Sequence, residues 1–351
     1  MKNIITTLVG DGIENPGNAL TMMHAAEMYG VVCSFRDTKG LHASGIIQAE
    51  LDSQLPVITS SEIAGMHSRI IAFDNLPNAK EVYGFKPGKD FAIVVGNERR
   101  GLSHKFRSLS TDAVQIPMIS RQINCLNVAA ASAVALHYLC RAKAGKMVKR
   151  RNPSSRRPEL LLIGAENHIE LGSAIRSATA FGWMRTFIED RKQVWFGCDR
   201  VTRSEGRAAA RRGRNRIRLI PCSTDLNHRF HEVVVVTKSR IGAPLHRIHL
   251  DRGTRQLVVI PDESSVQLED EAWKRFGREV KFAYVDTRVD DFPYHYRILA
   301  TLTMAEISRQ VGRQLPGVRK PSRPAPIYDR ALELISGQVG EDVWLDDLLD
   351  Y

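Results

Sequence analysis

Residues able to hold a ligand are concentrated in two short segments between positions 91 and 139. Gly96 to Gly101 sets a glutamate between two glycines, directly after the apolar run Phe91–Val95. Cys125-Leu126-Asn127 follows a second apolar run, Val114–Met118, and leads into a small-residue helix predicted over 128–139. Loops at the ends of neighbouring strands form a crevice that backbone groups can approach closely. The two segments therefore predict a ligand site and leave the ligand open.

The same segments resemble a known family. GNERRGLS at 96–103, IPM at 116–118 and CLNVAAASAVAL at 125–136 are similar to the second and third motifs of the SpoU (TrmH-like) branch of the SPOUT RNA methyltransferases. That family's usual patterns are a GxExxG loop and an IPM…SLNVS segment. Two features depart from them, because Cys125 stands where serine is commoner and the loop from Met118 to Cys125 is slightly longer than usual.

The resemblance implies an α/β domain with a largely parallel sheet and a deep trefoil knot, an exception to the rule that chains do not thread loops. It also implies that S-adenosylmethionine (AdoMet) binds in a bent shape between the motif loops, and that the protein methylates RNA. Carried over position by position, the implied cofactor-binding residues are Val95, Gly96, Asn97, Glu98, Gly101, Ile116, Met118, Cys125, Leu126 and Asn127.

A helix predicted from Asn18 to Gly30 resembles the family's first motif, in which an asparagine precedes an arginine by six positions. Asn18 fits that asparagine and is also predicted to be the helix N-cap, with Gly30 ending the helix. The arginine position holds His24. Because the family ties that arginine closely to catalysis, its loss from this helix is a departure that matters.

The chain then repeats itself. A strand predicted at 160–164 and a helix at 167–182 match the first copy at an offset of 152 (167 − 15). At this offset Asn15, Ala26 and Gly30 meet Asn167, Ala178 and Gly182, and His24 meets Arg176. The family's arginine is therefore present, but in the second copy.

The later part of the second copy has lost the cofactor loops. Residues 256–263 fall on the FAIVVGNE stretch at an offset of 165 (261 − 96), where Pro261 replaces Gly96 and Val266 replaces Gly101. A helix predicted at 299–311 follows, and nothing before it matches Cys-Leu-Asn. A repeat of this size indicates duplication of a whole domain.

The predicted organisation is a SPOUT domain at 1–142, a basic linker at 143–158, a degenerate SPOUT-like repeat at 159–312 and a C-terminal tail at 313–351. Family members are typically homodimers with active sites near the subunit interface, so the fused copies are predicted to form an internal pseudo-dimer within a monomeric chain. We expect one working site, with Arg176 of the second copy reaching the pocket of the first. The alternative is that Arg176 is a relic held by packing or an ion pair.

Methyl transfer to a ribose 2′-hydroxyl requires alignment of that hydroxyl, which is a weakly acidic nucleophile. The predicted catalytic residues are Arg176, Glu98, Asn127, Asn18 and His24. A guanidinium has a pKa above about 12, which favours electrostatic stabilisation by Arg176 over proton abstraction. Glu98 could orient Arg176, accept the proton or stabilise its own loop. His24 could act as the base, or pack at an interface.

The net charge of +11 favours a polyanionic partner. Arginines concentrate in the linker and at 200–218, and those predicted to contact RNA are Arg150, Arg151, Arg203, Arg207, Arg211, Arg212 and Arg214. Arginine pairs bidentately with phosphate, which supports this interpretation. The alternatives are a solvated linker and a solvated run of charge.

Cysteine spacing, hydropathy and chain length exclude several classes of protein. The five cysteines, Cys33, Cys125, Cys140, Cys198 and Cys222, form no CxxC or Cys/His cluster, so neither a zinc site nor a disulfide framework is predicted. No run approaches the roughly 20 apolar residues of a membrane span. The length of 351 residues suits two domains with cores of their own. We therefore expect a cytoplasmic protein.

The predicted function is AdoMet-dependent methylation of RNA, most simply at a ribose 2′-hydroxyl of tRNA or rRNA. Two alternatives stay open. A catalytically silent RNA-binding protein would explain the missing arginine of the first copy, although the intact motif loops argue against it. A methyltransferase that acts on a base would explain the change at His24.

Overall fold

The computed structural model describes residues 6–51, 54–76, 78–118, 126–140, 157–165, 167–197, 217–222, 230–238, 240–250, 255–262, 271–272, 274–276, 280–288 and 295–312. All helices and strands reported below lie within the compact unit Met1–Gln314. Several predicted features fall outside the described residues, namely Cys125, most of the linker, the seven arginines predicted to contact RNA, and the tail at 313–351.

The first half of the chain forms a parallel sheet. Its six described strands are β1 (Thr6–Asp11), β2 (Val32–Arg36), β3 (Ile70–Phe73), β4 (Lys80–Glu81), β5 (Phe91–Gly96) and β6 (Asp112–Gln115), in the order β2-β1-β5-β3-β6-β4. Every neighbouring pair is parallel. Strand β5 lies near the centre with the sequence FAIVVG, an apolar run of the kind that a parallel strand buried on both faces requires.

Two long helices belong to this half, α1 (Pro16–Met28) and α5 (Val128–Cys140), together with the shorter η1 (Leu41–Ala43), α2 (Gly45–Glu50), α3 (Ser60–Met66) and α4 (His104–Leu109). The predicted N-cap of α1 is wrong. Asn15 caps the helix, and its side chain accepts the backbone N–H of Asn18 at 3.1 Å. Proline is favoured at the first helical position, so Pro16 starts the helix before Asn18. Asn18 therefore lies inside the helix.

The second half forms another parallel sheet. Its seven described strands are β7 (Glu159–Ile163), β8 (Arg185–Glu189), β9 (Arg218–Pro221), β10 (Glu232–Thr237), β11 (Ala243–Pro244), β12 (Gln256–Pro261) and β13 (Val280–Tyr284), in the order β11-β13-β10-β12-β7-β8-β9. The helices α6 (His168–Phe181), η2 (Leu245–Arg247) and α9 (Tyr296–Val311) accompany it. The predicted α/β class with largely parallel sheets is confirmed for the described residues.

The two sheets have the same strand order, both along the chain and in space. Read from its other edge, β8-β7-β12-β10-β13-β11 matches β2-β1-β5-β3-β6-β4 strand for strand. The additional β9 occupies the place where Val57 forms an isolated parallel bridge next to β2. The long helices agree as well, because Asn15 and Asn167 cap α1 and α6 in the same way and Gly30 and Gly182 follow them with positive φ.

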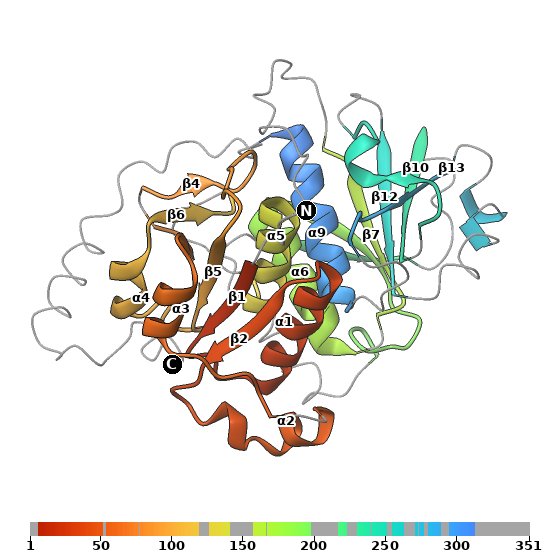
Figure 1. Cartoon of the computed structure of the whole chain (residues 1–351). Helices are drawn as coiled ribbons and strands as arrows, with labels where there is room; N and C mark the ends of the chain where they lie inside the picture. The colour runs from red at the N-terminus through yellow and green to blue at the C-terminus, as the bar shows by residue number, and fades with distance from the viewer. Residues whose placement is uncertain are drawn as a thin grey trace, which may run out of the picture. The chain divides into compact units, whose positions relative to one another are not determined.

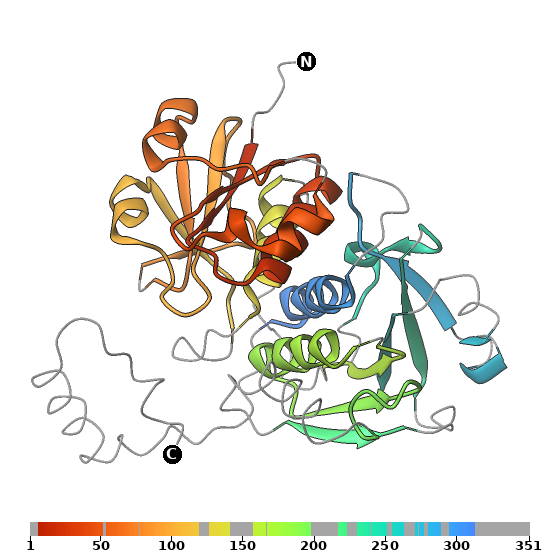
Figure 2. The ribbon, with the colours of Figure 1, turned by 90° about the horizontal axis from the view of Figure 1, so that it is seen from below.

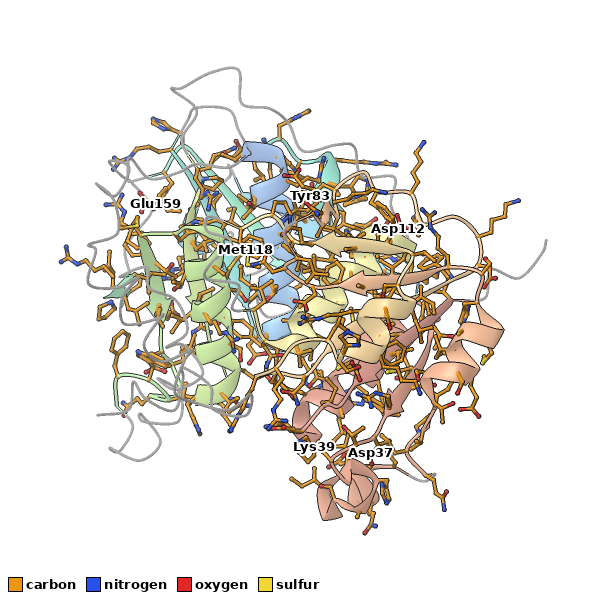
Figure 3. The ribbon with its side chains drawn as sticks, turned by 90° about the vertical axis from the view of Figure 1, so that its left-hand side faces the viewer. Asp37, Lys39, Tyr83, Asp112, Met118 and Glu159 are labelled. Carbon is orange, nitrogen blue, oxygen red and sulfur yellow. The ribbon has the colours of Figure 1, made fainter. Side chains whose placement is uncertain are left out.

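Helices pack together between the two sheets. Helix α5 contacts α1 and α9, and α6 contacts α9, as Figures 1 and 2 show. Tyr138 on α5 donates to the Glu306 carboxylate on α9 at 2.7 Å, and Glu306 pairs with Arg309 at 2.6 Å. Tyr83 lies beside α9 in Figure 3 and donates to the carbonyl oxygen of Ala305 at 3.0 Å. The helices of the described residues are all too short or too polar to cross a membrane.

Candidate functional site

The carboxyl end of β5 carries the first predicted loop. Asn97 and Gly101 exchange two backbone hydrogen bonds of 3.0 Å, which close the loop into a tight turn. The Asn97 side chain donates to the carbonyl oxygen of Gly12 at 2.6 Å, so the turn is tied to the end of β1. Gly96 lies so close to this turn that a Cβ built on it would be 2.1 Å from the Gly101 carbonyl carbon. Gly101 itself has φ of +68°. The conformation therefore requires both glycines of the motif.

Glu98 is held by the start of helix α1. Its Oε1 accepts the backbone N–H of Asn15 at 3.2 Å and the side-chain amide of Asn18 at 2.9 Å. Its Oε2 accepts the backbone N–H of Glu14 at 3.1 Å. The start of a helix has unpaired N–H groups and a partial positive charge, both of which stabilise an anionic side chain. Of the roles left open for Glu98, these contacts favour stabilisation of the loop.

Asn18 joins the two predicted loops. Its Nδ2 donates to Glu98, and its Oδ1 accepts the side-chain amide of Asn127 at 2.9 Å. The other end of the Asn127 amide caps α5, because Oδ1 accepts the backbone N–H groups of Ala129 and Ala130 at 3.0 and 3.3 Å. Residues from the three predicted motifs are thus connected in one hydrogen-bonded cluster.

Four of the predicted cofactor-binding residues are apolar and lie in the protein interior. Val95, Ile116, Met118 and Leu126 are all buried and belong to the same hydrophobic core. The strand predicted at 114–118 ends at Gln115, so Ile116 and Met118 stand on the irregular segment that follows β6. Apolar residues together with a few polar groups are typical of a site for a small organic ligand.

Arg176 and His24, which the offset of 152 sets at the same position, each form a hydrogen bond with the other half of the chain. Arg176 on α6 donates from Nη2 to the carbonyl oxygen of Leu126 at 3.0 Å, so it lies at the second predicted loop of the first half. His24 on α1 shares a hydrogen bond of 2.8 Å between its Nδ1 and the Nε2 of His295, and the two rings stack with centroids 5.1 Å apart. His295 immediately precedes α9, as Asn127 precedes α5.

Sequence reasoning missed three residues at this junction, Glu170, His295 and Arg297. The backbone N–H and the Nε of Arg297 donate to the two oxygens of Glu170 at 2.8 and 2.6 Å. Burial lowers the pKa of His295; Glu170 opposes that shift, while His24, Arg297 and Lys238 add to it. The alignment at an offset of 152, which sets Glu170 on Asn18, was the available signal for Glu170.

The loop after β2 adds charged groups next to the start of α1. Asp37 accepts the backbone N–H groups of Lys39, Leu41 and His42. Burial by itself raises the pKa of Asp37, but these hydrogen bonds and the His42 side chain lower it to about 2. Lys39 extends from the same loop, as Figure 3 shows, and its Nζ lies 3.4 Å from the carboxylate of Glu14.

Among the described residues, no group of three or more His, Cys, Asp or Glu could hold a metal ion.

Comparison with known proteins agrees with the motifs. Residues 6–137 match the model of the SpoU rRNA Methylase family. The resemblance to SpoU and TrmH-like enzymes is thereby confirmed for this part of the chain. No curated protein matches the chain.

Several solved structures are similar to the chain over limited lengths. The SpoU methyltransferase AviRb from Streptomyces viridochromogenes, solved with AdoMet, matches 39% of this chain and 57% of its own, with 20% identity and a TM-score of 0.33. The AdoMet-bound rRNA methyltransferase from Sinorhizobium meliloti matches over 39% and 56%, with 19% identity and a TM-score of 0.33. The TrmH/SpoU tRNA modifying enzyme from A. aeolicus matches over 38% and 73%, with 20% identity and a TM-score of 0.33. The match thus spans little more than half the length of the first two.

Proposed function

We propose, from the premise that residues 6–137 form a SpoU methylase domain, that this protein methylates RNA with AdoMet as methyl donor and that the acceptor is a ribose 2′-hydroxyl. One observation carries the proposal. Asn18 is hydrogen-bonded to both Glu98 and Asn127 at 2.9 Å, which joins residues of all three motifs in one cluster. A cluster assembled from such distant parts of the chain is the preorganised arrangement that a catalytic site needs.

The residues present fit AdoMet. Val95, Ile116, Met118 and Leu126 are apolar and buried, and they are the residues that would pack against an adenine ring. The close approach at Gly96 supports a site built from backbone groups, because a side chain there would collide with the loop. When bound, AdoMet supplies an electrophilic methyl group. Cys125, the remaining implied contact, lies outside the described residues.

We assign Arg176 to electrostatic stabilisation of the acceptor oxygen or its neighbouring phosphate. Its hydrogen bond to Leu126 supports a composite site in which the second half contributes a side chain to the cofactor pocket of the first. Glu98 accepts N–H groups on both oxygens, so we assign it to fixing the loop rather than to accepting a proton. The hydrogen bond between His24 and His295 supports an interface role for His24 in preference to that of a base.

The same proposal covers the architecture. We infer that residues 1–142 and 159–312 arose by duplication and act as an internal pseudo-dimer in a monomeric chain, with one working site. The shared strand order of the two sheets and the offset that relates their helices support this. A trefoil knot in the first half is part of the proposal, as the family premise implies.

The partner we propose is tRNA or rRNA, met in the cytoplasm. The net charge of +11 supports a polyanionic partner. The seven arginines predicted to contact RNA, at positions 150, 151, 203, 207, 211, 212 and 214, are proposed to contact RNA phosphates, and they lie outside the described residues.

The experiment that tests the function is incubation of the purified protein with methyl-labelled AdoMet and total cellular RNA, followed by digestion to nucleosides. We expect a 2′-O-methylated nucleoside, and its base and source RNA identify the substrate. Label on a base would replace the ribose with a base as acceptor. Absence of label together with absence of AdoMet binding would overturn the proposed activity and favour a catalytically silent relative.

A further inference from the structure

Arg297 lies where the second half meets the proposed site of the first, and none of the motifs includes it. We propose that Arg297, held in place by Glu170, is a positioning residue that fixes the side-chain amide of Asn18. Through Asn18 it sets the places of Glu98 and Asn127. This inference rests on the proposed function, because the cluster that Arg297 supports is the proposed cofactor site.

Glu170 holds Arg297 at two points. One carboxylate oxygen accepts the Nε of Arg297 at 2.6 Å, and the other accepts its backbone N–H at 2.8 Å. Only 12% of the Arg297 side chain and 8% of the Glu170 side chain are exposed, so solvent screens the pair weakly. His295 makes no side-chain capping bond at the start of α9, and Glu170 from α6 accepts an N–H of that first turn instead. The guanidinium is therefore fixed relative to both helices.

The remaining end of the guanidinium is directed at the first half. Its Nη1 lies 3.4 Å from the Oδ1 of Asn18, the oxygen that also accepts the amide of Asn127 at 2.9 Å. The Nδ2 of Asn18 donates to Glu98 at 2.9 Å. With the amide reversed, its NH2 group would face two donors and its oxygen would face a carboxylate. Arg297 contacts the oxygen of the Asn18 amide and Glu98 contacts its nitrogen, so the two residues together select one orientation of that amide.

Comparison of the two halves singles out this ion pair. Helices α5 and α9 align at an offset of 168 (296 − 128), which sets Arg297 on Ala129, while Glu170 falls on Asn18. The second half therefore has both members of an ion pair where the first half has an amide and a methyl group. Glu170 and Arg297 thus differ from the first half at both aligned positions, and the ion pair that they form contacts the half that contains the motif residues.

The test is a double-mutant cycle between Arg297→Met and Asn18→Ala in the full chain. AdoMet affinity is measured by titration calorimetry for the four proteins. We expect Arg297→Met to weaken AdoMet binding about ten-fold in the wild-type background and less than about two-fold in the Asn18→Ala background, because the contact it supports is then already lost. Urea unfolding of the same four proteins measures the coupling of the two residues without AdoMet.

Arg191→Met is the control, because the Arg191 side chain is more exposed than that of Arg297 and forms ion pairs with Glu189 and Glu271 within the same half; we expect its loss to leave AdoMet affinity unchanged. If Arg297→Met does not fold, Arg297→Lys replaces it; lysine lacks the separate nitrogens with which the guanidinium contacts Glu170 and Asn18, so we expect binding still to weaken. Equal AdoMet affinity in the wild type and the Arg297 variant, or strictly additive unfolding energies, would overturn the inference. A wild-type protein that binds no AdoMet overturns the proposed function instead, and the unfolding cycle then decides the inference alone.

Discussion

Arg176 and Leu126 are joined across the two halves by a hydrogen bond of 3.0 Å from a guanidinium nitrogen to a backbone carbonyl oxygen. His24, at the aligned position of the first half, forms a hydrogen bond with His295 just before α9, so this contact runs from the first half to the second. Each half thus extends one side chain to the loop that precedes the last helix of the other. The arginine contacts the half that contains the motif glycines Gly96 and Gly101, and the histidine contacts the half that has Pro261 and Val266 at the aligned positions.

Replacement of Arg176 by alanine is expected to lower the rate of methyl transfer by about 10²- to 10³-fold, because a preorganised cationic donor is lost. AdoMet affinity should change by less than about five-fold, since the hydrogen bond from Arg176 to Leu126 reaches a backbone carbonyl and not a side chain. Single-turnover transfer and titration calorimetry separate the two effects. Arg185→Ala, which removes an exposed partner of Glu159, serves as the control. Undiminished turnover by the Arg176 variant would reduce that residue to a relic of packing.

Replacement of Gly96 by alanine is expected to abolish AdoMet binding and to cost about 1–3 kcal/mol of unfolding free energy, as overpacking does. The new Cβ would lie 2.1 Å from the Gly101 carbonyl carbon and 2.2 Å from the Leu102 nitrogen, and backbone cannot move aside as a side chain can. Gly65→Ala is the matched control, because its Cβ meets nothing within 4 Å in helix α3. That change should stabilise the protein by about 0.5–1 kcal/mol. AdoMet binding by the Gly96 variant at wild-type affinity would contradict the description of the loop.

The elements that depend on local sequence pattern can be predicted from the sequence alone. The apolar run of β5 and the small-residue helix α5 lie where they were predicted, since both depend on residues close in the chain. Asn18 was misplaced as the N-cap, although the Asn15-Pro16 pair is itself a helix-start signal. Arg297 was missed because its partner Glu170 lies 127 positions away. Contacts of that kind depend on how α6 packs on α9, and no local pattern contains them.

Glu306 is a buried charged residue of α9 that contacts α5 through Tyr138. Its side chain is 3% exposed, and it is bound to Arg309 and Tyr138. Replacement by glutamine leaves the Arg309 charge buried without its counter-ion, so we expect a loss of about 3–5 kcal/mol in unfolding free energy. Urea unfolding measures it, with Glu271→Gln as an exposed control that should cost less than about 1 kcal/mol. A small loss at Glu306 would mean that the contact between the two halves does not depend on this buried pair.

We expect the stability of the protein to depend on pH through His295, which lies between the two halves. Burial lowers the pKa of His295 in the folded protein; Glu170 opposes the shift, and His24, Arg297 and Lys238 reinforce it. The unfolded chain, with a histidine pKa of about 6.5, therefore binds more protons than the folded chain in the window between the two values. This contribution to stability is present above about pH 6.5 and is lost as the pH falls through the folded pKa. Unfolding free energies at neutral and mildly acidic pH should thus fall more for the wild type than for His295→Asn, a variant that carries the residue found before α5. Equal losses in the two proteins would show that other groups cause the acid sensitivity, because every other titrating side chain is common to both.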